Sequence, residues 1–220
     1  MAEWKPPAGT GPRWILACVA GLAVGLPLAT LWGVTLRPDM LPGTSRVGLL
    51  IMALRALSGA ILGGCLGLAQ AWALRRVHPD LPPLRWIGAT AAAGYLAALI
   101  GMSVYGVLIA RFDGFQTSVF LVAAPLATGL LGGLIHGLAQ GLVLDGVVRR
   151  WVPWVWLNVL GWVLAAGISG LRSVLGLAGT EPLALVGGSV IVGALEGLAI
   201  GLVTAGAIRL MPAGRPAEAA

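Results

Sequence analysis

The tetrapeptide Gly-Leu-Ala-Gln occurs twice, in GGCLGLAQAWAL at residues 63–74 and in GLIHGLAQGLVL at residues 133–144. The two copies hold Gln70 and Gln140, which are two of the three glutamines of the chain. Both lie inside long apolar stretches, where an amide side chain is unusual. A repeated polar position in such surroundings indicates an internally duplicated membrane protein.

The composition supports this class. Hydrophobic residues make up 58% of the chain and charged residues 10%, with a mean hydropathy of +0.94, whereas soluble domains have about 25% charged residues. A spanning helix needs about 20 consecutive, mostly apolar residues. The sequence therefore predicts an all-α polytopic membrane protein, a single domain over residues 1–220, with spans near 14–36, 47–74, 87–110, 117–148, 154–171 and 183–210.

The basic residues predict an orientation. With six spans, one side of the membrane receives Lys5, Arg13, Arg75, Arg76, Arg85, Arg149, Arg150, Arg209 and Arg215. The other side receives fewer, interleaved with acidic residues: Arg37, Arg46, Arg111 and Arg172. By the positive-inside rule both termini are cytoplasmic, and we expect a bacterial cytoplasmic (inner) membrane. The basic residues are expected at the ends of the spans, so the net charge of +6 does not indicate nucleic-acid binding.

The six spans are expected to be three tandem two-helix hairpins. Spans two and four align at Gly59, Gly63, Gly67, Gln70 and Leu74 with Gly129, Gly133, Gly137, Gln140 and Leu144. The sixth span aligns Gly193 and Gly197 with Gly133 and Gly137, so that Ile200 replaces the glutamine. The odd spans share a tryptophan followed by a glycine, at Trp14 and Gly21, Trp86 and Gly94, and Trp154 and Gly161. Such parallel repeats imply a pseudo-symmetry axis along the membrane normal.

Glycines four residues apart form a flat stripe on one helix face, which allows a neighbouring helix to approach closely. We expect three such stripes to pack in the interior, at 59–67, 129–137 and 193–201. The tryptophans are expected to form a belt at the cytoplasmic headgroups instead: Trp4, Trp14, Trp86, Trp151, Trp154 and Trp156.

The residues 63–75 and 133–144 resemble those of uncharacterised bacterial multispan proteins with repeats of the form G-x-x-x-G-L-A-Q-W-x-x-L-R. The resemblance covers about the central two-thirds of the chain. Trp72 is displaced by one residue from that pattern, the second copy has no tryptophan, and the third copy lacks the glutamine. No function is assigned to that group, so the resemblance implies an architecture only.

Polar residues within spans are costly and mark candidate sites. In the repeat alignment His136 and Glu196 fall at one equivalent position, with Leu66 as the third member. Gln70 and Gln140 follow that position by one helical turn and therefore lie on the same face. The sharpest hypothesis is a binding stripe along an inner surface, made of His136, Glu196, Gln70 and Gln140.

Three interpretations of this stripe remain open. His136 and Glu196 pair as a structural contact between helices, or the stripe handles a small solute or a proton, or His136 holds a pigment or haem. No cofactor is expected, because a b-type haem usually takes two axial ligands and the second histidine, His78, lies in a predicted loop. Cys18 and Cys65 lack metal-ligand spacing, so no metal site is expected either.

No catalytic motif is present, and an enzyme is not expected. The leading functional hypothesis is a non-catalytic membrane scaffold or accessory subunit, acting with membrane-protein partners or as a homo-oligomer in the lipid bilayer. The alternative is a small-solute transporter or membrane substrate-capture subunit that uses the polar stripe.

Overall fold

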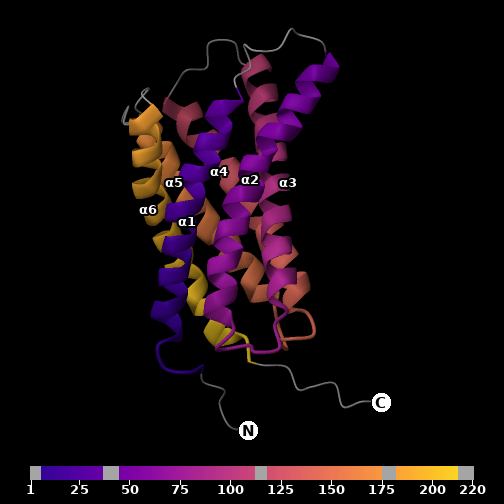
Figure 1. The fold of residues 1–220 in the computed structure, drawn as a ribbon, viewed down its shortest axis with the longest axis vertical. Coiled ribbons are helices and arrows are strands. Elements are labelled where there is room, and N and C mark those ends of the chain that lie inside the picture. Colours follow the sequence, from indigo (N-terminus) through magenta and orange to yellow (C-terminus); the bar gives the residue numbers. More distant parts are fainter. Residues whose placement is uncertain (1–5, 37–44, 112–117, 175–181, 213–220) are drawn as a thin grey trace.

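The computed structural model describes residues 6–36, 45–111, 118–174 and 182–212, except for the side chains of 45–47, 105–111, 118–122, 173–174, 182–183 and 209. Within these ranges the chain forms six helices (Figure 1): α1 (Thr10–Thr35), α2 (Ser45–Leu74), α3 (Pro83–Arg111), α4 (Ser118–Leu144), α5 (Val152–Val174) and α6 (Pro182–Leu210). Each is long and apolar enough to cross a membrane. The prediction of an all-α protein with six such helices is confirmed.

Local chemistry explains several helix ends. α3 and α6 begin at Pro83 and Pro182, and proline suits the first turn because no helical partner is required there for its missing N–H. The prediction that the fourth span continues to residue 148 is wrong. α4 ends at Leu144, and Gly146 takes a left-handed conformation with φ of 83° that breaks the helix. The other expected bounds differ by about one turn or less.

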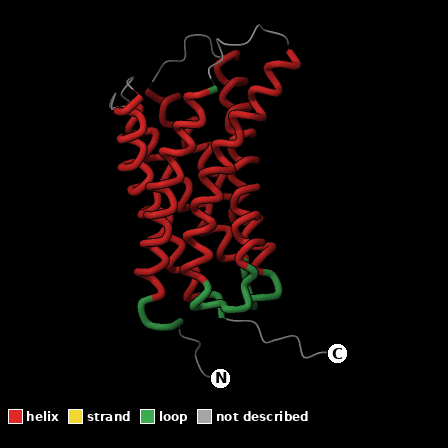
Figure 2. The backbone as a smooth tube through the Cα atoms, viewed as in Figure 1, coloured by secondary structure: helices red, strands yellow, loops and turns green. Residues whose placement is uncertain are grey.

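The helices form a closed ring in chain order. Each helix packs against its two neighbours in the sequence, and α6 returns to pack against α1. α1 begins and α6 ends at the same end of the bundle, which we call the terminal end, together with the connections 75–82 and 145–151 (Figures 1 and 2). Arginines gather at this end, at Arg13, Arg75, Arg76, Arg85, Arg149 and Arg150. Lys5, Arg37, Asp39, Asp113, Glu181 and Arg215 lie outside the described residues.

The most extensive contacts are α2 with α3, α4 with α5, and α6 with α1. In each pair the glycine stripe of the even helix lies directly on the backbone of the odd helix. A Cβ added at Gly137 would lie 2.8 Å from Val155 Cα, one added at Gly67 would lie 3.1 Å from Ile87 Cα, and one added at Gly201 would lie 2.9 Å from Ile15 Cα. The three stripes therefore permit helix separations that no other residue allows.

The same contacts fix the register of the sixth helix. The first glycines of the three stripes, at 59, 129 and 193, face Gly94, Trp162 and Leu22, and the second glycines, at 63, 133 and 197, face Thr90, Asn158 and Cys18. The partners of the first glycines lie eight residues after Trp86, Trp154 and Trp14, respectively. The partners of the second glycines lie four residues after the same tryptophans. Gly193 therefore occupies the place of Gly129, not that of Gly133. The sequence alignment of the sixth span was wrong by one helical turn.

In this register His136 corresponds to Leu66 and Ile200, and Gln140 corresponds to Gln70 and Thr204. Each of the six residues is almost completely buried. Glu196 instead corresponds to Leu62 and Gly132, one turn farther from the terminal end. The sequence-based expectation that His136 and Glu196 are equivalent is therefore not supported by the contacts.

The expected tryptophan belt is also wrong for three of its members. Trp14, Trp86 and Trp154 have no exposed surface and meet inside the ring. Their rings pack edge to face, with centroids 5.5 Å apart for Trp14 and Trp154 and 5.7 Å apart for Trp86 and Trp154. Trp156 is exposed, as a belt residue would be, and Trp4 lies outside the described residues.

Large apolar side chains cover the outward faces of the helices. They include Leu16, Leu68, Leu138, Leu142, Ile191, Leu195 and Leu202, all of them exposed. A surface of this kind suits contact with lipid tails and would be unfavourable in water. Glycines lie at the contacts between helices and large apolar side chains cover the outward faces, as expected when close backbone contact holds helices together in a bilayer.

Two adjacent glycines of α4 test this packing. A Cβ at Gly133 would lie 2.6 Å from Val159 Cα, whereas a Cβ at Gly132 would lie 3.7 Å from Ala97 Cβ, an ordinary contact. We expect Gly133→Ala to lower the free energy of unfolding by about 1–3 kcal/mol and Gly132→Ala to leave it unchanged or raise it slightly. Titration with sodium dodecyl sulfate in mixed micelles measures both. Equal effects of the two variants would contradict the stripe packing.

Candidate functional site

A hydrogen-bonded layer fills the ring near the terminal end. Gln140 is its centre: Nε2 donates to Gln70 Oε1 and to Thr90 Oγ1, each at 3.0 Å, and Oε1 accepts from Trp154 Nε1 at 3.1 Å. Trp14 Nε1 donates to Thr204 Oγ1 at 2.8 Å. We call these residues, together with Trp86, the tryptophan layer. Its members come from α1, α2, α3, α4, α5 and α6, so all six helices are tied together at this level.

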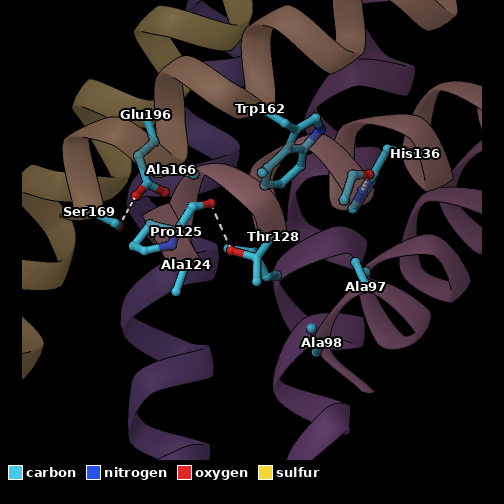
Figure 3. A pocket seen from close by; sticks show the side chains of 15 residues that line it. Ala97, Ala98, Ala124, Pro125, Thr128, His136, Trp162, Ala166, Ser169 and Glu196 are labelled. Atoms are coloured by element: carbon cyan, nitrogen blue, oxygen red, sulfur yellow. Dashed lines mark hydrogen bonds between the residues drawn. The ribbon is translucent and has the colours of Figure 1, made fainter. Parts of the chain in front are cut away.

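Above the layer, away from the terminal end, the ring contains a cavity of about 390 Å³. Helices α2 to α6 line it, mainly with glycine and alanine, and it is not sealed from the outside. Its polar side chains are Thr128, His136, Trp162, Ser169 and Glu196. Figure 3 shows Glu196 and Ser169 together in one part of this central cavity and His136 and Trp162 together in another.

His136 and Trp162 form a stacked pair, with ring centroids 4.4 Å apart and planes inclined at 27°. Nδ1 of His136 lies 2.8 Å from the carbonyl oxygen of Gly132. Because a carbonyl oxygen only accepts, Nδ1 carries the proton, and Nε2 of the neutral ring is an acceptor. Among the described residues, neither His136 Nε2 nor Trp162 Nε1 has a hydrogen-bond partner, and both atoms are buried. The pair thus holds one unused acceptor and one unused donor.

Glu196 projects from α6 toward α5. Its Oε1 accepts a hydrogen bond from Ser169 Oγ, and the side chain is 6% exposed. Arg172 is close enough to interact electrostatically with the carboxylate. Its Nη2 has no hydrogen-bond partner in the described residues and lies against Gly188 of α6. The α5–α6 contact therefore holds the carboxyl group of Glu196 at the cavity wall, with Ser169 and Arg172 on the facing helix.

The four residues of the predicted stripe do not form one surface. His136 and Glu196 both line the central cavity, but no hydrogen bond or ion pair joins these two described residues. Gln70 and Gln140 do not line it, because their side chains make hydrogen bonds within the tryptophan layer. The repeated glutamines close one end of the ring, whereas His136 and Glu196 line the cavity.

Sequence reasoning missed Trp162, Ser169 and Arg172. Trp162 lies eight residues after Trp154, as Leu22 lies eight residues after Trp14. The repeat therefore indicates that the two residues face the same way. Ser169 and Arg172 are three apart and share a helix face, which was a weaker signal. Asp145, just after the end of α4, accepts a hydrogen bond from Trp151 Nε1 at 3.2 Å.

Comparison of the chain with protein-family models, with curated proteins and with solved structures found no match. The residues of the cavity are therefore the basis for its interpretation. Among the described residues no three histidine, cysteine or acidic side chains gather as metal ligands do. What the cavity offers is hydrogen bonding in apolar surroundings.

A double-mutant cycle tests the separation of His136 from Glu196. Residues without shared partners change stability additively, to within about 0.5 kcal/mol. We expect His136→Phe and Glu196→Gln to behave in this way when the free energy of unfolding is measured singly and together. Glu196→Gln and Ser169→Ala, which share a hydrogen bond, serve as the coupled control. A large coupling between positions 136 and 196 would instead support a structural pair.

Proposed function

We propose that this protein is a small-solute capture or transport subunit of the bacterial cytoplasmic membrane that binds its solute in the central cavity. The observation that carries the proposal is the stacked His136–Trp162 pair in the cavity lining, whose Nε2 and Nε1 atoms have no hydrogen-bond partner among the described residues. A buried polar group without a partner costs about 1–3 kcal/mol. A scaffold gains nothing from this cost, whereas a binding site recovers it when the ligand supplies the missing partners.

The free pair also favours a type of ligand. A hydroxyl or a primary or secondary amide can both donate to His136 Nε2 and accept from Trp162 Nε1–H. The glycine and alanine walls suit a compact apolar body, as in most small-molecule sites. The expected solute is therefore a small apolar molecule with one hydroxyl or amide group.

The orientation and the repeat belong to the same proposal. The arginines at the terminal end support cytoplasmic termini under the positive-inside rule. The common register of the three glycine stripes supports an origin in three copies of a two-helix unit, with the third copy aligned one turn away from the sequence-based alignment. In this account the copies diverged where function required it, at His136 and Glu196.

The scaffold function expected from the sequence remains the second candidate. It is favoured by an apolar groove on the outside between α1 and α2, lined by Leu16, Ala17, Ala20, Gly21, Val24, Cys65, Leu68, Ala69 and Trp72. The Arg13 guanidinium lies 3.7 Å from the centre of the Trp72 ring at the edge of this groove. A partner helix could pack there, and such a function needs no ligand in the cavity.

A matched pair of probes separates the two functions. 1-Naphthol and naphthalene share a ring system and differ by one hydroxyl. We expect purified protein to bind 1-naphthol about 5–10-fold more tightly than naphthalene, because one hydrogen bond contributes about 1 kcal/mol. Equilibrium dialysis, supported by the shift in unfolding temperature, measures the difference.

His136→Phe keeps the stacking on Trp162 but removes the acceptor, and should abolish the preference for 1-naphthol. Leu138→Phe, on the exposed face of α4, is the control and should retain it. If both probes bind equally to the unmodified protein, or neither binds, the capture function is wrong and the scaffold is favoured.

A further inference from the structure

The contact between α3 and α4 is the least extensive of the six in the ring. Within the other two hairpins a glycine of the odd helix lies on the backbone of the even helix. A Cβ at Gly21 would lie 2.9 Å from Leu66 Cα, and one at Gly161 would lie 3.2 Å from Ile200 Cα. Counted from its tryptophan, α3 carries Ala93 at this position. α3 therefore lacks the glycine that allows close approach.

The remaining small residues between α3 and α4 are in loose contact. A Cβ at Gly132 would lie 3.7 Å from Ala97 Cβ, and one at Gly101 would lie 3.5 Å from Thr128 Cγ2. A Cβ added at either position would therefore make an ordinary van der Waals contact, whereas a Cβ added along the glycine stripes would overlap the neighbouring helix. Ala97 of α3 and Thr128 of α4, which lie on the two sides of this contact, both line the central cavity. We call the contact between α3 and α4 the α3–α4 seam.

The outer surfaces of the two helices at the seam are apolar. Leu96 and Ile100 of α3 and Leu130 of α4 are exposed, so both helices carry a surface suited to lipid tails. The tryptophan layer closes the cavity toward the terminal end, where Trp14, Trp86 and Trp154 are fully buried. An apolar molecule dissolved in the bilayer would therefore meet the cavity at its least packed wall.

We propose that the cavity takes a membrane-partitioning small molecule, which enters from the bilayer through the α3–α4 seam. The inference rests on the proposed capture function and specifies its ligand class. Entry through the seam avoids transfer of an apolar ligand through water, and it requires only that two loosely packed helices separate. Inside, the hydroxyl or amide group of the ligand reaches the His136–Trp162 pair.

Disulfides across defined contacts test the route. Cβ atoms joined through a disulfide lie about 3.5–4.5 Å apart, which the Ala97 and Gly132 positions satisfy at 3.7 Å. Ala97→Cys with Gly132→Cys would hold the seam closed. Gly64→Cys with Ala91→Cys, at 4.0 Å, joins the tightly packed α2 and α3 and serves as the control. Both pairs are made with Cys18→Ala and Cys65→Ala, which remove the native thiols.

The probe is a trifluoromethyl-iodophenyl-diazirine, a small aromatic reagent that partitions into bilayers and inserts into nearby groups on illumination. The protein is reconstituted into phosphatidylcholine vesicles, labelled, and analysed by mass spectrometry. Labelling of Trp162, in the cavity, is expressed relative to Trp156, which is exposed on the same helix. The ratio corrects for the amount of reagent in the membrane.

We expect Trp162 to be labelled while the seam cysteines are reduced, and the ratio to fall severalfold once the disulfide fixes the helix separation. The control disulfide should leave the ratio unchanged. The proposal is overturned if Trp162 is not labelled without a disulfide, if labelling persists with the seam closed, if the control disulfide also abolishes it, or if only the control pair oxidises. Failure of the capture function would appear separately, in the comparison of 1-naphthol with naphthalene.

Discussion

Close backbone contact along three glycine stripes is the constraint on which the rest of this structure depends. Between helices in a bilayer there is little hydrophobic attraction, because lipid tails are as apolar as the side chains. Helices then associate through dispersion and weak backbone interactions, which need a short separation. The carbonyl oxygens of Thr90, Asn158 and Cys18 lie over the second glycine of each stripe, where only a hydrogen atom fits.

The stripes also decide where the polar residues go. Because each odd helix docks at the same register, Trp14, Trp86 and Trp154 arrive at one level and meet inside the ring. Their indole N–H groups then need acceptors, and Gln140 and Thr204 supply them for two of the three. Gln140 thus accepts from Trp154 directly, and Gln70 accepts in turn from Gln140. A layer that fills the ring at one level leaves a cavity beyond it, where the inward residues are small.

The six helices and the glycine stripes could be predicted because they depend on local pattern: apolar length and four-residue spacing. The register of α6 could not. Gly193, Gly197 and Gly201 repeat every turn, so a shift of one turn matches almost as well, and only the contacts with α1 decide between the two. The false equivalence of His136 and Glu196 followed from that shift. A tryptophan near a helix end suits both a headgroup belt and a core, and tertiary packing selected the core for Trp14, Trp86 and Trp154.

Departures from the repeat coincide with the candidate site. His136 stands where the other even helices carry Leu66 and Ile200, and Ala93 stands where the other odd helices carry Gly21 and Gly161. The first change places unpaired hydrogen-bonding capacity in the cavity, and the second loosens the wall beside it. Under the proposed function, these two departures place the polar group and the looser packing where a ligand would bind and pass. The close glycine contacts of the other helix pairs still hold the ring together.

Closure of the ring between α1 and α6 is the claim most directly open to measurement, because it joins the two ends of the chain. Thr30 Oγ1 and Ser189 Oγ lie 3.0 Å apart across this contact. In a chain with Cys18→Ala and Cys65→Ala, cysteines replacing Thr30 and Ser189 should form a disulfide within one molecule on mild oxidation in the membrane. Non-reducing electrophoresis after cleavage between α1 and α6 reports it. Fragments that separate without reductant, or links found only between two copies, would contradict the closed ring.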